Sequence, residues 1–197
     1  MSNKSPKLKL MVASTVYGFQ TELEQICGVL SGYGYEIWNS HIGTIPTHPG
    51  KTNLKNCVNA VRNCDLFLGI IRPFYGTGIV GRRSITHNEM REAVKLNKPR
   101  WFLAHEHVQF ARQVFRQYRY TGSGKRKRFK FVRTAVMDDL RVIDLFDDVV
   151  QTTVPIRERT GNWCQDFRTV NDILQFVKTQ FADTSRVTLI CKEMQHR

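Results

Sequence analysis

The sequence predicts an α/β fold in which a mostly parallel sheet carries helices on both faces. Short apolar segments alternate with longer segments whose apolar residues recur at helical spacing, over roughly residues 8–104. One apolar segment, Leu66–Ile71, contains no polar residue, which is typical of a strand buried on both faces of its sheet. Because strands that alternate with amphipathic helices form parallel sheets, these observations set the expected fold class.

The first two strand–helix units occupy the amino-terminal third of the chain. A strand is predicted at residues 8–13, and a short loop follows it at residues 14–18. The next helix has apolar residues on one face, namely Phe19, Leu23, Ile26 and Leu30. Residues 35–38 form a second short strand, and residues 41–51 are rich in Pro and Gly and predict a loop. A second helix then carries its apolar face on Leu54, Cys57, Val58 and Val61.

The third strand, Leu66–Ile71, opens the unit that holds the candidate chemistry. A loop at residues 72–78 leads to a helix that starts near Ser84 and ends at Asn97-Lys98-Pro99. A fourth strand is predicted at residues 100–104. We therefore expect residues 1–105 to form the α/β core.

The second half of the chain, residues 106–197, is expected to complete the same domain with a basic segment and a C-terminal α/β extension. A helix is predicted through Tyr118, before a Gly-Ser-Gly break. Residues 139–150 are compatible with a strand or a helix. Thr169-x-x-Asp172 predicts the start of a last helix, and residues 186–191 are predicted to be extended.

Composition excludes several classes of protein. The five cysteines form no Cys-x-x-Cys pair, so neither a zinc site nor a disulfide framework is predicted. The histidines form no ligand cluster, and we expect no metal and no cofactor. No apolar run is long enough to span a bilayer, and no signal peptide is recognised, so a cytoplasmic protein without a membrane partner is expected.

Glu89 is the most informative residue, and two interpretations of it stand side by side. A carboxylate at a helix start, beside the carboxyl end of a parallel strand, lies where open α/β sheets place ligand chemistry. Thr86-x-x-Glu89 also fits a capping box, in which the glutamate only closes the backbone of its own helix.

The loops that leave the predicted strands should converge around Glu89. They carry aromatic rings, small hydroxyls and glycine, a mixture that suits a nucleoside, with a base stacked on a ring and ribose hydroxyls held by the carboxylate. The candidate substrate-binding residues are Ser14, Thr15, Tyr17, Trp38, Phe74, Tyr75, Gly76, Thr86 and His87. Arg83 precedes the helix and is a candidate for a bidentate phosphate contact. No dinucleotide fingerprint, Walker sequence or nucleophile elbow is present.

These segments resemble a known family. Val12–Phe19, the strand and Pro-Phe-Tyr-Gly loop at residues 66–76, and Ser84–Glu89 are similar to a prokaryotic family of domains of unknown function. Trp163–Phe181 resembles the end of that domain. The family is TIR-like in fold and often precedes STAND-type NTPases, so the resemblance implies a flavodoxin-like or TIR-like sheet.

A looser similarity links Glu89 to glycosidic-bond chemistry. In nucleoside 2-deoxyribosyltransferases a nucleophilic glutamate begins a helix that ends in Gly-Lys-Pro, and Glu89 stands ten residues before Pro99. TIR-domain NAD hydrolases also carry their catalytic glutamate on a helix before a late strand. This chain has Asn97 where the transferases have glycine, and Met90-Arg91-Glu92 where they have small residues, which argues against covalent transfer.

The resemblance implies a protein that cleaves the N-glycosidic bond of NAD or a related nucleotide in antiviral defence, with Glu89 as the catalytic carboxylate. The nucleotide would be a substrate. A non-catalytic module that binds a nucleotide or a protein is the alternative. Further partners are another copy of the chain or an effector protein.

The net charge of +13 is concentrated in one segment. Between Phe110 and Arg133, basic residues interleave with aromatic residues and no acidic residue occurs, a pattern typical of single-stranded nucleic-acid binding. Arg126, Lys127 and Arg128 are the candidate contacts. In the alternative, the aromatic rings pack inward, and the basic side chains form a solvated face or pair with the Asp-rich block that follows.

Overall fold

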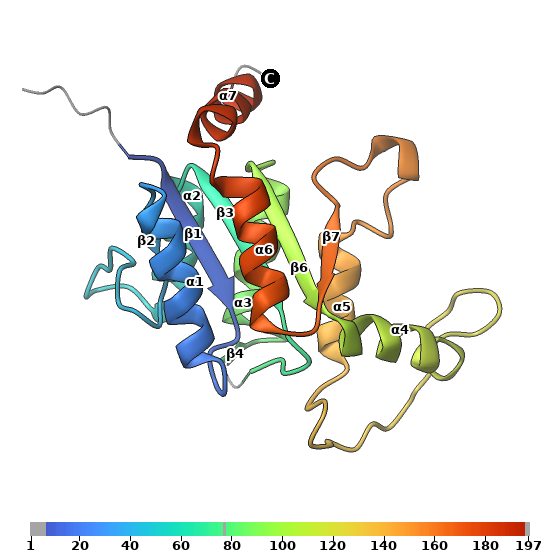
Figure 1. Cartoon of the computed structure of the whole chain (residues 1–197). Helices are drawn as coiled ribbons and strands as arrows, with labels where there is room; N and C mark the ends of the chain where they lie inside the picture. Colours follow the sequence, from blue (N-terminus) through green and yellow to red (C-terminus); the bar gives the residue numbers. More distant parts are fainter. Residues whose placement is uncertain (1–6, 77, 196–197) are drawn as a thin grey trace, which may run out of the picture.

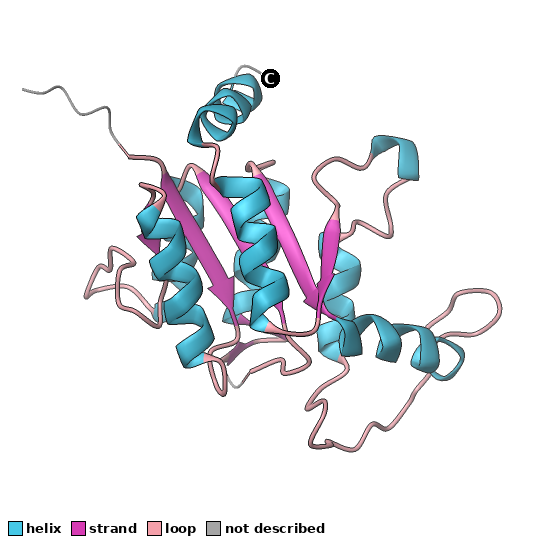
Figure 2. Cartoon of the chain, viewed as in Figure 1, coloured by secondary structure: helices cyan, strands magenta, loops and turns pink. Residues whose placement is uncertain are grey.

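A five-stranded parallel sheet forms the centre of the protein (Figures 1 and 2). The computed structural model describes residues 7–76 and 78–195. The strands are β1 (Lys9–Ser14), β2 (Glu36–Trp38), β3 (Leu66–Ile71), β6 (Arg100–His105) and β7 (Cys164–Phe167). They lie in the order β2-β1-β3-β6-β7, and every neighbouring pair in this sheet is parallel. This is the flavodoxin-like order, so the predicted fold class is confirmed.

Helices cover both faces of the sheet (Figure 1). On one face, α1 (Gln20–Gly32) and α6 (Val170–Phe181) bury Leu23, Ile26 and Ile173 against the strands, and α7 (Thr184–Gln195) follows α6. On the other face lie α2 (Asn53–Asn63), α3 (Ile85–Lys95) and α5 (Arg141–Val149), with α4 (Glu106–Arg119) packed against α5. The remaining elements are the hairpin β4 (Ile79–Val80) and β5 (Arg83–Ser84) and a 3-10 turn, η1 (Ile156–Glu158).

The strand order creates a switch point between β1 and β3. From β1 the chain moves to β2 on one side and then returns to β3 on the other. The loops that leave β1 and β3 therefore diverge to opposite faces and leave a crevice at the carboxyl end of the sheet. Ligands of open α/β sheets bind in this crevice.

Two predictions about the start of α3 and the end of the chain are wrong. Ser84 caps α3, because its side chain accepts a hydrogen bond from the backbone N–H of His87 at 3.2 Å. Glu89 therefore lies in the second turn, and the Thr86-x-x-Glu89 capping box does not form. Residues 186–191 lie in α7 rather than in an extended segment, because Val187 and Cys191, one helical turn apart, are buried against the core.

The predictions for the starts of α4 and α6 and for residues 139–150 can be compared with the structure in the same way. Thr169 and Asp172 form the capping box of α6, as the sequence predicts. Residues 139–150, which the sequence left between strand and helix, contain α5. α4 is present and already begins at Glu106.

Candidate functional site

A cavity of about 1230 Å³ lies at the switch point of the sheet. Its walls come from the loops after β1, β2 and β3, from the start of α2, from the first two turns of α3, and from Arg133 and Asp138 before α5. The predicted residues among its lining are Ser14, Thr15, Tyr17, Phe74, Tyr75, Gly76, Thr86 and Glu89. The structure thus brings most of the candidate residues together, although they are spread over more than half of the core sequence.

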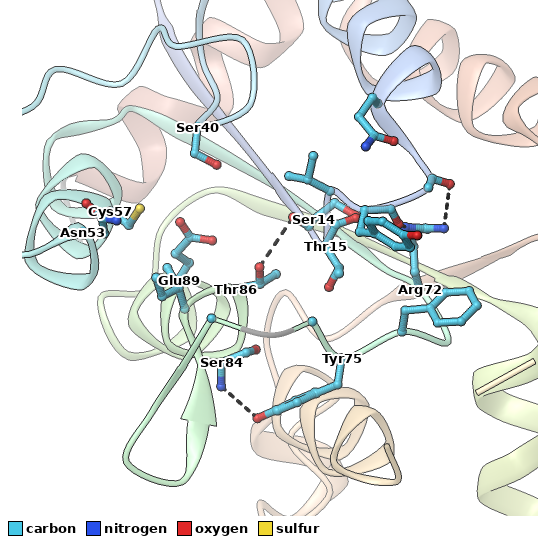
Figure 3. A pocket seen from close by; sticks show the side chains of 18 of the residues that line it. Ser14, Thr15, Ser40, Asn53, Cys57, Arg72, Tyr75, Ser84, Thr86 and Glu89 are labelled. Carbon is cyan, nitrogen blue, oxygen red and sulfur yellow. Dashed lines mark hydrogen bonds between the residues drawn. The ribbon is translucent and has the colours of Figure 1, made fainter. Parts of the chain in front are cut away.

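Glu89 enters the cavity from α3 and faces Cys57 of α2 (Figure 3). Only 4% of Glu89 is exposed, and no arginine, lysine or histidine among the described residues forms an ion pair with it. Burial raises the pKa of Glu89 to about 7, and a hydrogen bond with the Cys57 side chain opposes this rise. A carboxyl group with this pKa is present in both protonation states near neutral pH, which is the condition for acid–base or nucleophilic work.

Hydroxyl groups stand beside the carboxylate. Thr86 lies one turn before Glu89, and its Oγ1 donates to the carbonyl of Ser14 at 3.5 Å, joining α3 to the end of β1. Figure 3 shows Thr86, Ser14 and Thr15 between Glu89 and Arg72. Small hydroxyl groups therefore line the cavity between Glu89 and Arg72, and they leave room for a sugar ring.

Arg72 holds the loop after β1 in place, a role that sequence reasoning missed. Its guanidinium donates to the carbonyls of Thr15 (3.1 Å), Tyr17 (2.7 Å) and Gly18 (2.9 Å). It also lies over the ring of Phe74, at 5.3 Å from the centroid. Burial lowers the pKa of Arg72. The position of Arg72 directly after a buried strand could have indicated this role, because a buried cation there needs hydrogen-bond acceptors from a neighbouring loop.

Gly76 allows the loop after β3 to approach the loop after β1. Its φ of +85° lies in the left-handed region that favours glycine. A Cβ at this position would stand 3.1 Å from the Cγ2 of Thr15. The glycine thus serves a close contact between the two loops, in addition to any contact with a ligand.

His87 is not a cavity residue, contrary to the prediction. Its ring lies behind the cavity wall, with Nδ1 at 2.7 Å from the Tyr75 hydroxyl and Nε2 at 2.9 Å from Asp148 Oδ2. A carboxylate only accepts, so Nε2 carries a hydrogen and, in the neutral ring, Nδ1 accepts from Tyr75. Arg91 also donates to Asp148, at 2.5 Å. This network ties the loop after β3 to α3 and α5, and it holds the ring away from the cavity.

Two further predicted residues lie outside the cavity, and a third stands at its rim. Trp38 is 6% exposed and packs in the core, where its Nε1 donates to Glu36 at 2.8 Å. β2 is the edge strand, so its side chains lie away from the crevice between β1 and β3. Arg83 lies in the β4–β5 hairpin and does not line the cavity. Tyr17 lines the cavity but is 83% exposed, so its ring stands free at the rim.

Several cavity residues were missed because they come from segments without a recognisable motif. Cys57, predicted to be a small core residue, is buried but also lines the cavity beside Glu89. The other polar lining residues that the sequence did not assign to this site are Gln20, Thr47, Asn53, Asn56, Arg133 and Asp138. Asp138 accepts from the backbone N–H of Tyr75 at 2.7 Å, which brings the distant 120–138 segment against this cavity.

The Asp-rich block neutralises part of the basic segment. Arg119 and Arg126 both pair with Asp144, at 2.5 and 2.8 Å, and Arg112 pairs with Asp147 at 2.6 Å. Arg119 is only 3% exposed. The predicted pairing with the Asp-rich block is therefore confirmed for these three arginines.

The predicted nucleic-acid contacts are only partly available. Arg126 is paired, and Lys127 Nζ donates to the carbonyl of Gln117 at 3.0 Å. Arg128 is exposed, and the stacked rings of Tyr118 and Phe129, with centroids 5.6 Å apart, remain partly exposed as well. Nucleic-acid binding by this segment stays a prediction.

Among residues 7–76 and 78–195, no group of three or more His, Cys, Asp or Glu side chains is placed to hold a metal ion. Within the same part of the chain, no helix has the length and apolarity needed to cross a membrane.

The fold and the cavity define a flavodoxin-like α/β protein with a buried carboxyl group at the switch point of its sheet. Residues 9–180 match the family described as "Domain of unknown function (DUF4062)", and the chain belongs to that family. Membership in a family of unknown-function domains was predicted from the sequence. The TIR-like character and the link to STAND-type NTPases stay predictions.

Other comparisons give only distant likenesses. No curated protein matches the chain significantly. A conserved protein from Enterococcus faecalis V583 is 10% identical with a TM-score of 0.45, covering 89% of this chain and 99% of that one. A 2-desoxiribosyltransferase from Leishmania mexicana is 14% identical with a TM-score of 0.39, covering 73% and 97%. Similarity at this level carries no argument about activity.

Proposed function

We propose that this protein cleaves the N-glycosidic bond of NAD or a related nucleotide, with Glu89 as the catalytic carboxylate. The observation that carries the proposal is a glutamate that is 4% exposed, lies in a large cavity at the switch point, and has a pKa raised to about 7. A structural glutamate would be expected to be solvated or paired. Glu89 is buried without an ion-pair partner among the described residues, which costs stability and suggests a functional reason.

The chemistry follows from the charge that develops during cleavage. The bond between the ribose carbon and the base nitrogen breaks, and its electron pair leaves with the base. Positive charge then spreads over the ribose carbon and ring oxygen, where the Glu89 carboxylate stabilises it. Water adds to the ribose carbon and releases a proton. The hydroxyls of Ser14, Thr15 and Thr86 line the same cavity, and in this proposal they orient the sugar.

The wider role that we propose is defence signalling, by analogy with the TIR-like proteins that the sequence resembles. Cleavage would either deplete the NAD pool or make a signalling nucleotide. This part of the proposal rests on resemblance alone.

The test is nicotinamide release from NAD at high protein concentration, by wild type, Glu89→Gln and Glu92→Gln. Glu92 is the matched control, because it lies one turn further along α3 and pairs with Arg62 at 2.7 Å outside the cavity. We expect release by wild type and Glu92→Gln, and none by Glu89→Gln. Equal release by all three would refute the role of Glu89. No release by wild type would contradict NAD cleavage and favour a non-catalytic binding module.

A further inference from the structure

The cavity has an acidic end and a basic end. Glu89 and Cys57 stand at one side, and Arg72 stands at the opposite side, with the hydroxyls of Ser14 and Thr15 between them (Figure 3). Arg133 lines the cavity as well. A ligand that fills such a space can place an electron-poor group near the carboxylate and an anionic group near an arginine.

The two arginines differ in whether their guanidinium groups are free to bind a ligand. The Arg72 guanidinium already donates hydrogen bonds to three backbone carbonyls of the loop after β1. Arg133 is exposed, and no ion pair or hydrogen bond joins its side chain to another described residue. The ion pairs of the basic segment are made by other arginines, on the α5 side. The Arg133 guanidinium therefore lines the cavity without a hydrogen-bond or ion-pair partner among the described residues.

Two acidic groups lie close enough to Arg72 to influence it, and neither forms an ion pair with Arg133. Asp138 lines the same cavity, but it accepts from the Tyr75 backbone at 2.7 Å and forms no ion pair with Arg133 among the described residues. Glu22 lies in the first turn of α1 and lines a neighbouring hollow instead of this cavity. A cavity of about 1230 Å³ is large enough for a complete nucleotide.

We infer that Arg133 determines specificity by contacting a phosphate of the nucleotide while Glu89 faces the ribose carbon, so that the same nucleoside without its phosphate binds more weakly. A guanidinium binds phosphate through two parallel hydrogen bonds, which gives both affinity and orientation. Arg133 is thus the specificity-determining residue, in place of Arg83, which lies outside the cavity. This inference rests on the proposed function of the same site.

The experiment measures binding without turnover. In a Glu89→Gln background, calorimetry compares nicotinamide mononucleotide with nicotinamide riboside, which differ only in the phosphate. Arg133→Gln is then added, and Arg128→Gln serves as the control, because Arg128 is an exposed arginine of the same segment that does not line the cavity. Circular dichroism checks that each variant is folded.

We expect the phosphate to strengthen binding about tenfold, as one charge-assisted contact would. Arg133→Gln should remove most of this advantage, while Arg128→Gln should keep it. Equal affinity for the two ligands, an advantage that survives Arg133→Gln, or no binding of either ligand at millimolar concentration would overturn the inference. Phosphate-dependent binding without nicotinamide release would refute only the proposed cleavage, and release without phosphate preference would refute only the role of Arg133.

Discussion

Replacing Glu89 with Gln should stabilise the protein at alkaline pH. Glutamine has nearly the same shape and carries no charge, so it occupies the same space without the cost of burying a carboxylate. Burial raises the pKa of Glu89 from 4.5 to about 7, and each unit of difference corresponds to about 1.36 kcal/mol. The buried charge therefore costs the wild type about 3 kcal/mol of its free energy of unfolding above pH ~7.

The sign follows from proton linkage. The folded state binds the Glu89 proton more tightly than the unfolded state. Below pH 4.5 the carboxyl group is protonated in both states, so it does not lower the free energy of unfolding. As the pH rises from 4.5 to about 7, the unfolded state ionises first and the wild type loses stability relative to Glu89→Gln. Above that window the difference between the two proteins stays constant.

Urea denaturation of both proteins at a series of pH values across that window measures this difference. Glu92→Gln provides the reference for an α3 carboxylate that is paired with Arg62. The expected result is two curves that coincide in acid and separate by about 3 kcal/mol in alkali. A difference that does not change with pH would refute the reasoning, because it would mean that the pKa of Glu89 is the same in the folded and unfolded states.

Three more perturbations probe the surroundings of the carboxylate. Cys57→Ala should raise the pKa of Glu89 further, because it removes a hydrogen bond that favours the ionised form, and the same denaturation series would show the pH window moving upward. Gly76→Ala should destabilise the protein by about 1–2 kcal/mol, since φ is +85°, and thermal unfolding would show a lower midpoint. Burial raises the pKa of Asp148, but hydrogen bonds from His87 and Arg91 outweigh it and lower that pKa. Asp148→Asn should therefore cost about 1–3 kcal/mol at neutral pH, and unchanged stability would argue against this network.

Elements whose signal is local could be predicted from the sequence alone. An uninterrupted apolar run predicted β3, and apolar spacing predicted α1, α2 and α6, because each pattern reports the burial of a side chain beside its own neighbours. Alternation of strands and helices then predicted the parallel sheet. Glu89 could be named as a candidate because the carboxyl end of β3 and the start of α3 are close in the sequence.

Which side chains share the cavity depends on how distant elements pack, and the sequence does not show this. Cys57 stands beside Glu89 because α2 packs against α3, and no local pattern encodes that contact. Asp148 holds His87 across 61 residues of sequence, which removed a predicted ligand contact from the site. Arg133 reaches the cavity from a segment whose composition suggested nucleic-acid binding. The periodicity of apolar residues shows whether a residue is buried. Which residue it then contacts depends on how distant elements pack. Those contacts set the pKa of Glu89 and the charge around the cavity.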